Sequence, residues 1–175
     1  QPTNYAGSFS TLYRNEGDGT FRDVSAEAGI QVTNPATGAA MGKALGLTIV
    51  DFDGNGYEDV FVANDTVQNH LFLNRGDGTF DERGFDSGAG FDGSGKATGA
   101  MGVDLADFRG NGELGVGVAN FANEMTSLFV TRGDGTAGLS FSDDAMGEGI
   151  GSPSRQRLSF GLFFLDYDLD GRPDL

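Results

Sequence analysis

The chain carries short runs of apolar and polar positions, and each run is bounded by turn-forming residues. Residues 44–51 place Leu, Leu and Ile at alternate positions, and residues 59–63 form a nearly continuous apolar run. Two further runs, 70–74 and 80–83, are separated by Gly-Asp-Gly-Thr, in which Asp-Gly is a good hairpin signal. Runs of this length and period predict four short antiparallel strands, and no segment shows sustained helical periodicity.

A sequence pattern repeats about every 58 residues. Its hairpin part begins at Leu12, Leu71 and Leu128, which are 59 and 57 residues apart. The acidic loops described next keep the same spacing, and two independent motifs with one period indicate a repeated structural unit. Four tightly connected strands per unit are typical of a β-propeller blade, so we expect an all-β chain of about three repeats.

Two acidic loops of nine residues carry the candidate chemistry: Asp51-Phe-Asp-Gly-Asn-Gly-Tyr-Glu-Asp59 and Asp166-Tyr-Asp-Leu-Asp-Gly-Arg-Pro-Asp174. Each has oxygen-bearing side chains at positions 1, 3, 5 and 9 and Gly at position 6, and position 7 can add a backbone carbonyl. Calcium takes six to eight such hard oxygen ligands, whereas magnesium prefers a stricter octahedron. The pattern departs from an EF-hand loop, because position 12 of the first copy is Val62 and not Glu. The alternative is a metal-free turn, since Asp, Asn and Gly favour turns.

The middle copy of the loop, residues 107–115, has lost two of these side chains. Arg109 replaces the carboxylate at position 3, and Gly115 replaces the one at position 9. We expect the Arg109 side chain to reach Asp107 or Asp104 and to occupy the space of an ion. The sequence therefore predicts two calcium ions, with the loop at Asp107 empty.

Three stretches, 12–30, 101–121 and 158–175, resemble the FG-GAP/VCBS repeat proteins of the cartilage acidic protein and UnbV (ASPIC) type. The resemblance implies an integrin-like propeller of about seven blades, secreted or exposed at a surface, with calcium in its acidic loops. Carried over residue by residue, it gives a metal role to Asp51, Asp53, Asn55, Tyr57 and Asp59, and to Asp166, Asp168, Asp170, Arg172 and Asp174, with Tyr57 and Arg172 acting through their carbonyls.

The chain is interpreted as one repeat array. Residues 1–43 would be a partial blade and connection, 44–100 a blade with a calcium loop, 101–157 a blade with the degenerate loop, and 158–175 the start of the next blade with its calcium loop. Because a propeller typically has at least four blades, we expect a segment of a larger propeller. Flanking blades or other copies of the same protein would then cover its ends.

Composition narrows the functional classes. The net charge is −15, with 26 acidic and 11 basic residues, which argues against nucleic acid as a partner. No apolar run approaches the length of a membrane span. With no Cys there are no disulfides, so metal loops are the available cross-link. The balance fits a secreted protein, extracellular or at the cell surface, or one in the periplasm.

The expected function is non-catalytic: a calcium-binding extracellular module that binds a protein or glycan partner or builds a surface assembly. The chain has one His, His70, and no evident nucleophile-and-base pair, which argues against an enzyme. The alternatives are a propeller-type polysaccharide lyase or glycosidase, or a lectin. The integrin-binding tripeptide occurs at Arg75-Gly-Asp77 and Arg132-Gly-Asp134, but both lie in the repeated hairpin and are interpreted as turn chemistry.

Overall fold

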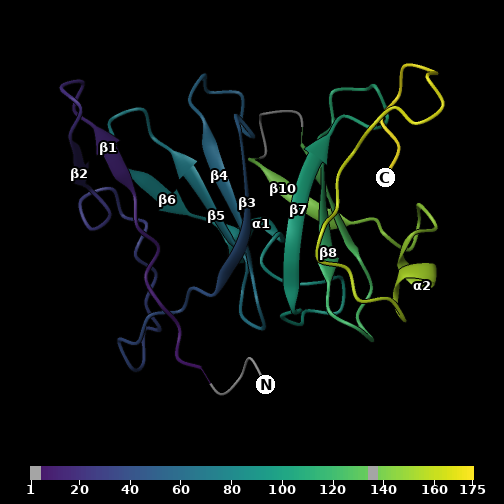
Figure 1. The fold of residues 1–175 in the computed structure, drawn as a ribbon, viewed down its shortest axis with the longest axis horizontal. Helices are drawn as coiled ribbons and strands as arrows, with labels where there is room; N and C mark the ends of the chain where they lie inside the picture. Colours follow the sequence, from purple (N-terminus) through teal and green to yellow (C-terminus); the bar gives the residue numbers. More distant parts are fainter. Residues whose placement is uncertain (1–4, 134–137) are drawn as a thin grey trace.

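The computed structural model describes residues 5–133 and 138–175, and within them the chain is all-β, as predicted (Figure 1). One four-stranded antiparallel sheet contains β3 (Ala44–Val50), β4 (Asp59–Asn64), β5 (His70–Asn74) and β6 (Phe80–Glu82) in that order. A second contains β7 (Ala100–Ala106), β8 (Gly115–Asn120), β9 (Ser127–Arg132) and β10 (Ser140–Asp143). The remaining strands, β1 (Tyr13–Asn15) and β2 (Phe21–Asp23), form a separate two-stranded ribbon.

The strand predictions for residues 44–83 are confirmed to within one or two residues at each end. Two single-turn helices, α1 (Gly84–Ser87) and α2 (Gly151–Ser154), were not predicted, because four residues are too few to show a helical period. The Gly-Asp-Gly-Thr turn predicted between β9 and β10 falls mostly outside the described residues.

The two four-stranded sheets stand side by side, with β3 and β7 adjacent near the centre of the molecule (Figure 1). The main core lies between the sheets, where Phe61 of β4 meets Phe129 of β9 at a ring-centroid distance of 6.1 Å. A second core, which includes Val62 and Phe72, covers the other face of the first sheet. The inner strands β4 and β8 are therefore buried on both faces, which explains why their sequences are nearly continuous apolar runs.

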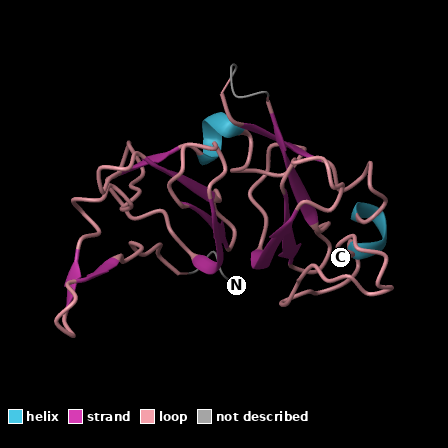
Figure 2. Cartoon of the chain, turned by 90° about the horizontal axis from the view of Figure 1, so that it is seen from above, coloured by secondary structure: helices cyan, strands magenta, loops and turns pink. Residues whose placement is uncertain are grey.

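The ribbon β1–β2 and the segment 158–175 lie at opposite ends of the molecule (Figure 2). Among the described residues, the segment 158–175 forms no named strand, although Leu165 and Asp174 pair as an isolated antiparallel bridge. No helix in the described part of the chain is both long and apolar enough to cross a membrane.

Candidate metal centres

The three acidic loops fold alike around their first residue. In each, the carboxylate at position 1 accepts the backbone N–H groups of positions 5 and 6 at distances of 2.8–3.1 Å. The glycine at position 6 has φ between 85° and 88°, a conformation that side chains disfavour. The carboxylates belong to Asp51, Asp107 and Asp166, and the glycines are Gly56, Gly112 and Gly171. Because this arrangement uses only positions 1, 5 and 6, the middle loop keeps it despite its substitutions.

The first loop brings three carboxylates together between β3 and β4. Asp51, Asp53 and Asp59 each offer an oxygen, and these oxygens lie within 4.8 Å of one another. Asp59 begins β4 and is fully buried. Its two oxygens accept the backbone N–H groups of Asn74 (2.7 Å) and Phe52 (2.8 Å), which hold the carboxylate toward the loop.

The electrostatics of this group favour a cation. Burial raises the pKa of Asp59, and the negative charges of Asp53 and Asp51 raise it further. Among the described residues, no Lys, Arg or His forms an ion pair with Asp59. A buried carboxylate without a cation is costly, and hard oxygen donors suit a hard divalent ion. The three carboxylates of the first loop are therefore suited to hold a calcium ion.

The third loop repeats this grouping in a more exposed position. Oxygens of Asp166, Asp168 and Asp174 again lie within 4.8 Å of one another. Asp174 accepts the N–H of Tyr167 at 3.0 Å, matching the contact between Asp59 and the second residue of the first loop. Because Asp174 is exposed while Asp59 is buried, the two groups differ in solvation although their sequences are nearly equivalent.

The position-5 residues predicted as ligands are engaged within their own loops. Asn55 Oδ1 accepts the N–H of Tyr57 at 2.8 Å. Asp170 lies outside the three-carboxylate grouping, and its Oδ2 pairs with Arg172 Nη2 at 2.7 Å. That contact is the main reason why the pKa of Asp170 is lowered. Their metal role, like that of the Tyr57 and Arg172 carbonyls, remains a prediction.

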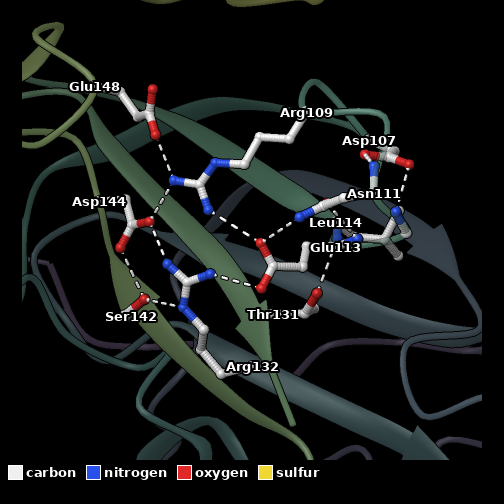
Figure 3. Close-up of polar contacts among 11 residues, drawn as sticks. Asp107, Arg109, Asn111, Glu113, Leu114, Thr131, Arg132, Ser142, Asp144 and Glu148 are labelled. Carbon is white, nitrogen blue, oxygen red and sulfur yellow. Dashed lines mark hydrogen bonds and ion pairs between the residues drawn. The ribbon is translucent and has the colours of Figure 1, made fainter. Parts of the chain in front are cut away.

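The position predicted for Arg109 was wrong. Its guanidinium does not turn into the loop toward Asp107 or Asp104 but extends toward the turn after β10 (Figure 3). There it pairs with Asp144 (2.7 Å), with Glu113 (3.1 Å) and with Glu148. Glu113 at position 7 of the loop, together with Asp144 and Glu148 outside it, attracts the cation more strongly than Asp107, which is already satisfied by backbone N–H groups.

The space of the missing position-9 carboxylate is filled by Phe108. A Cβ built on Gly115 would lie 2.6 Å from the Phe108 ring. The same ring stacks on Phe164 and receives the Arg109 guanidinium 5.0 Å from its centroid. The described residues contain no three-carboxylate group at this loop, so an aromatic contact stands where the other two loops have an acid.

Sequence reasoning missed the network to which Arg109 belongs. Arg132 of β9 joins Glu113 (2.8 Å) and Asp144, and Ser142 donates to Asp144 (Figure 3). Hydrogen bonds from Asn111, Arg132 and Arg109 lower the pKa of Glu113 to about 2. The only available signal was the spacing of Arg109 and Glu113, because the other members come from distant parts of the chain.

Residues 51–118 match the family model of the FG-GAP-like repeat. The chain thus contains an FG-GAP-like repeat. The match begins at Asp51, the first residue of the first acidic loop, and ends inside β8, so it includes both the intact first loop and the degenerate middle loop.

The chain is also 34% identical over 100 residues to cartilage acidic protein 1 of Homo sapiens. The matched region covers 57% of this chain and 13% of the human protein. The chain therefore corresponds to a small part of that relative.

The tripeptide Arg75-Gly-Asp77 is folded into the hairpin between β5 and β6. Arg75 pairs with Asp81, and Asp77 Oδ1 accepts both the N–H (3.0 Å) and the hydroxyl (2.6 Å) of Thr79. In the second tripeptide, Arg132 belongs to the network above, and Asp134 lies outside the described residues. The Arg and Asp side chains that are described are thus engaged in local contacts.

Proposed function

We propose that the chain is a calcium-stabilised, non-catalytic module that acts outside the cell and presents its repeats to a protein or glycan partner. The grouping of Asp51, Asp53 and Asp59 carries this proposal, because a fully buried acid stands beside two others. Calcium, when bound, would neutralise their repulsion and hold the β3–β4 connection together. Binding energy at such a site is also folding energy.

The four-stranded sheets are proposed to be propeller blades, in units of 44–100 and 101–157 flanked by the partial units 1–43 and 158–175. Support comes from the side-by-side placement of β3 and β7, the first strands of successive units. A closed propeller needs at least four blades, and about seven is the number proposed for the complete ring.

The extracellular location and the non-catalytic role are supported by the FG-GAP-like repeat and by the acidic, Cys-free composition. The match to this repeat does not favour the alternative of a polysaccharide lyase, a glycosidase or a lectin. A structural role for calcium also makes a simple prediction for stability, because a ligand that binds only the folded state raises the melting temperature.

The test is a thermal melt of the chain in about 10 mM CaCl₂, in MgCl₂ and in EGTA. Extracellular calcium modules bind with dissociation constants near 10⁻⁴ M. At 100-fold excess, each site then adds about 2.7 kcal/mol to the free energy of unfolding, or roughly 5–10 °C to the melting temperature.

Two variants separate the acidic loop from a general effect of charge. Asp53→Asn should remove about half of the calcium-dependent rise in melting temperature. Asp77→Asn, which makes the same charge change in a hairpin turn, should keep all of it. Equal melting temperatures in calcium and EGTA would refute the proposal.

A further inference from the structure

A cavity of about 500 Å³ lies at the end of the second sheet that is opposite to the acidic loop at Asp107. Three segments form its walls: residues 92–98, which lead into β7, residues 123–127 between β8 and β9, and residues 143–155, which run from the end of β10 through α2. None of these segments contains a residue of the acidic loops. The cavity is therefore separate from the candidate metal centres.

Tertiary hydrogen bonds hold these walls in place. The N–H of Asn123 donates to the carbonyl oxygen of Arg155 at 2.8 Å, and the N–H of Gly93 donates to Asp143 Oδ2 at 3.3 Å. Each bond joins two walls that are distant in the sequence. The cavity is thus formed by the fold itself, as is typical of small-molecule sites.

One wall resembles a phosphate-binding loop in the spacing of its glycines, Gly90-Phe-Asp-Gly-Ser-Gly-Lys96. The N–H groups of residues 93–96 are, however, all used within the protein. Three of them donate to Asp92, two to its Oδ1 and one to its carbonyl oxygen, and the fourth donates to Asp143. No backbone nest is left for phosphate, so the binding capacity of this wall comes from side chains.

Two cationic side chains line the cavity without an acid partner. Neither Lys96 nor Arg155 forms an ion pair or a side-chain hydrogen bond with any other residue that the structure describes, and Lys96 acts on Asp92 through its charge alone. Seven of the eleven basic residues do pair with an acid. In this strongly acidic chain, two cations at one cavity are therefore available to a ligand.

The carboxylates of the cavity also keep unused oxygens. Glu124 Oε2 accepts the N–H of Gly99 at 2.6 Å, and Asp92 uses its Oδ1 within its own turn. Within the described parts of the chain, Glu124 Oε1 and Asp92 Oδ2 have no hydrogen bond, whereas both oxygens of Asp143 are engaged. Opposite charges thus line one cavity without touching each other.

We propose that the cavity binds a zwitterionic α-amino acid, with its carboxylate at Arg155 and Lys96 and its ammonium group at Glu124 and Asp92. A guanidinium group matches a carboxylate through two parallel hydrogen bonds, and an ammonium group offers three donors to carboxylate oxygens. A neutral dipolar ligand satisfies both sets of groups at once. A dianion such as phosphate satisfies only the cations and is repelled by the three carboxylates.

The walls also favour an apolar side chain on the ligand. Met125 and Met146 line the cavity, and Met146 is 59% exposed. Methionine side chains adapt to apolar groups of irregular shape. Because the cavity is also large enough for a small organic ligand, L-leucine is a suitable probe. The site goes beyond the module proposed above and uses none of its calcium ligands.

Amide chemical-shift titration of the ¹⁵N-labelled chain with L-leucine, in calcium at neutral pH, tests the inference. We expect saturable shifts in residues 92–98 and 123–127, with a dissociation constant on the order of 1 mM, as suits a ligand of this size. Isocaproate lacks the ammonium group of L-leucine, and isoamylamine lacks its carboxylate. Each should bind at least about 10-fold more weakly, because one set of charged hydrogen bonds is lost.

Two variants each remove one charge from the cavity. Arg155→Gln and Glu124→Gln should both weaken L-leucine binding at least about 10-fold, and Glu124→Gln keeps an oxygen for the N–H of Gly99. Arg157→Gln is the matched control, because Arg157 also lacks an ion pair among the described residues but lies outside the cavity. It should bind L-leucine like the unmodified chain.

Circular dichroism should give the same spectrum for all three variants, so that lost binding is not mistaken for lost folding. The inference is wrong if L-leucine causes no saturable shift up to about 50 mM, well above the expected dissociation constant. It is also wrong if isocaproate or isoamylamine binds as tightly as L-leucine, or if either cavity variant binds L-leucine normally.

Discussion

Arg109 Nη2 lies 2.7 Å from Asp144 Oδ2 and joins the degenerate acidic loop to the turn after β10. Arg132 contacts the same carboxylate from β9, so Asp144 is held by two cations. The network ties the loop between β7 and β8 to β9, to β10 and to the turn after β10. It gives this repeat a metal-independent connection where its neighbours have three carboxylates.

Replacing Arg109 by Gln should lower the melting temperature by about 2–4 °C in EGTA, since several charge-assisted bonds are lost together. Arg75→Gln is the matched control, because it breaks one ion pair with Asp81 that is about half exposed. Exposed single pairs contribute little, so this variant should melt within about 1 °C of the unmodified chain. Similar decreases in melting temperature in both variants would show that the network stabilises the fold no more than one surface ion pair does.

Isothermal titration should find two calcium ions per chain. Arg109→Asp should leave that number at two, although it restores the carboxylate at position 3, because Phe108 still fills the space beside Gly115. Asp53→Asn should reduce the count to one. A third ion bound by Arg109→Asp would mean that Arg109 alone keeps the middle loop empty.

The buried His70 should make folding stability depend on pH. Among the described residues its ring nitrogens have no hydrogen-bond partner, and burial lowers its pKa to about 4 from an ordinary 6.5. The unfolded chain then binds a proton more readily than the folded chain. The neutral His70 contribution is thus fully present above pH 6.5 and is lost as the pH falls toward 4, at a cost on the order of 3 kcal/mol.

Urea unfolding of the unmodified chain and of His70→Leu, measured at pH 7.0, 5.5 and 4.5, checks this expectation. His70 is the only His, so any pH dependence that remains in the variant belongs to the carboxylates. The variant should gain stability relative to the unmodified chain as the pH falls. If the difference in unfolding free energy between the two proteins is the same at all three pH values, the lowered pKa of His70 is contradicted.

Gly46, Gly102 and Gly161 occupy equivalent positions of the repeat, in the segments Leu-Gly-Leu, Met-Gly-Val and Phe-Gly-Leu. Alanine at these three positions should have unequal effects on stability. Gly46→Ala and Gly102→Ala push a methyl group against the backbone of the next unit, and overpacking of this kind costs about 1–3 kcal/mol. Both should lower the melting temperature by several degrees, as read by circular dichroism of dilute protein. Gly161→Ala meets no neighbour and should change it by less than about 1 °C. Equal losses at all three positions would point to the strand conformation of glycine and not to its close contacts.

The strands and the three loops follow from the sequence because their causes are local. Period-two patterning and Asp-Gly turns place β3 to β6, and the carboxylate of Asp51 caps its own loop through N–H groups no more than five residues away. The residues at positions 1, 5 and 6 specify the same loop conformation in each of the three copies. A repeat of about 58 residues was visible for the same reason.

Only the tertiary structure decided where Arg109 goes, how deeply Asp59 is buried and which surfaces stay open. Asp144 and Glu148 reach Arg109 from more than 30 residues away, and no local pattern ranks such partners against Asp107. Asp59 is buried because the first sheet surrounds it, with N–H groups of Phe52 and Asn74 on its two oxygens, and the loop sequence alone does not show this. Exposure at Leu47 and close packing at Val103 likewise depend on whether a neighbouring unit is present, and the apolar residues themselves do not reveal it.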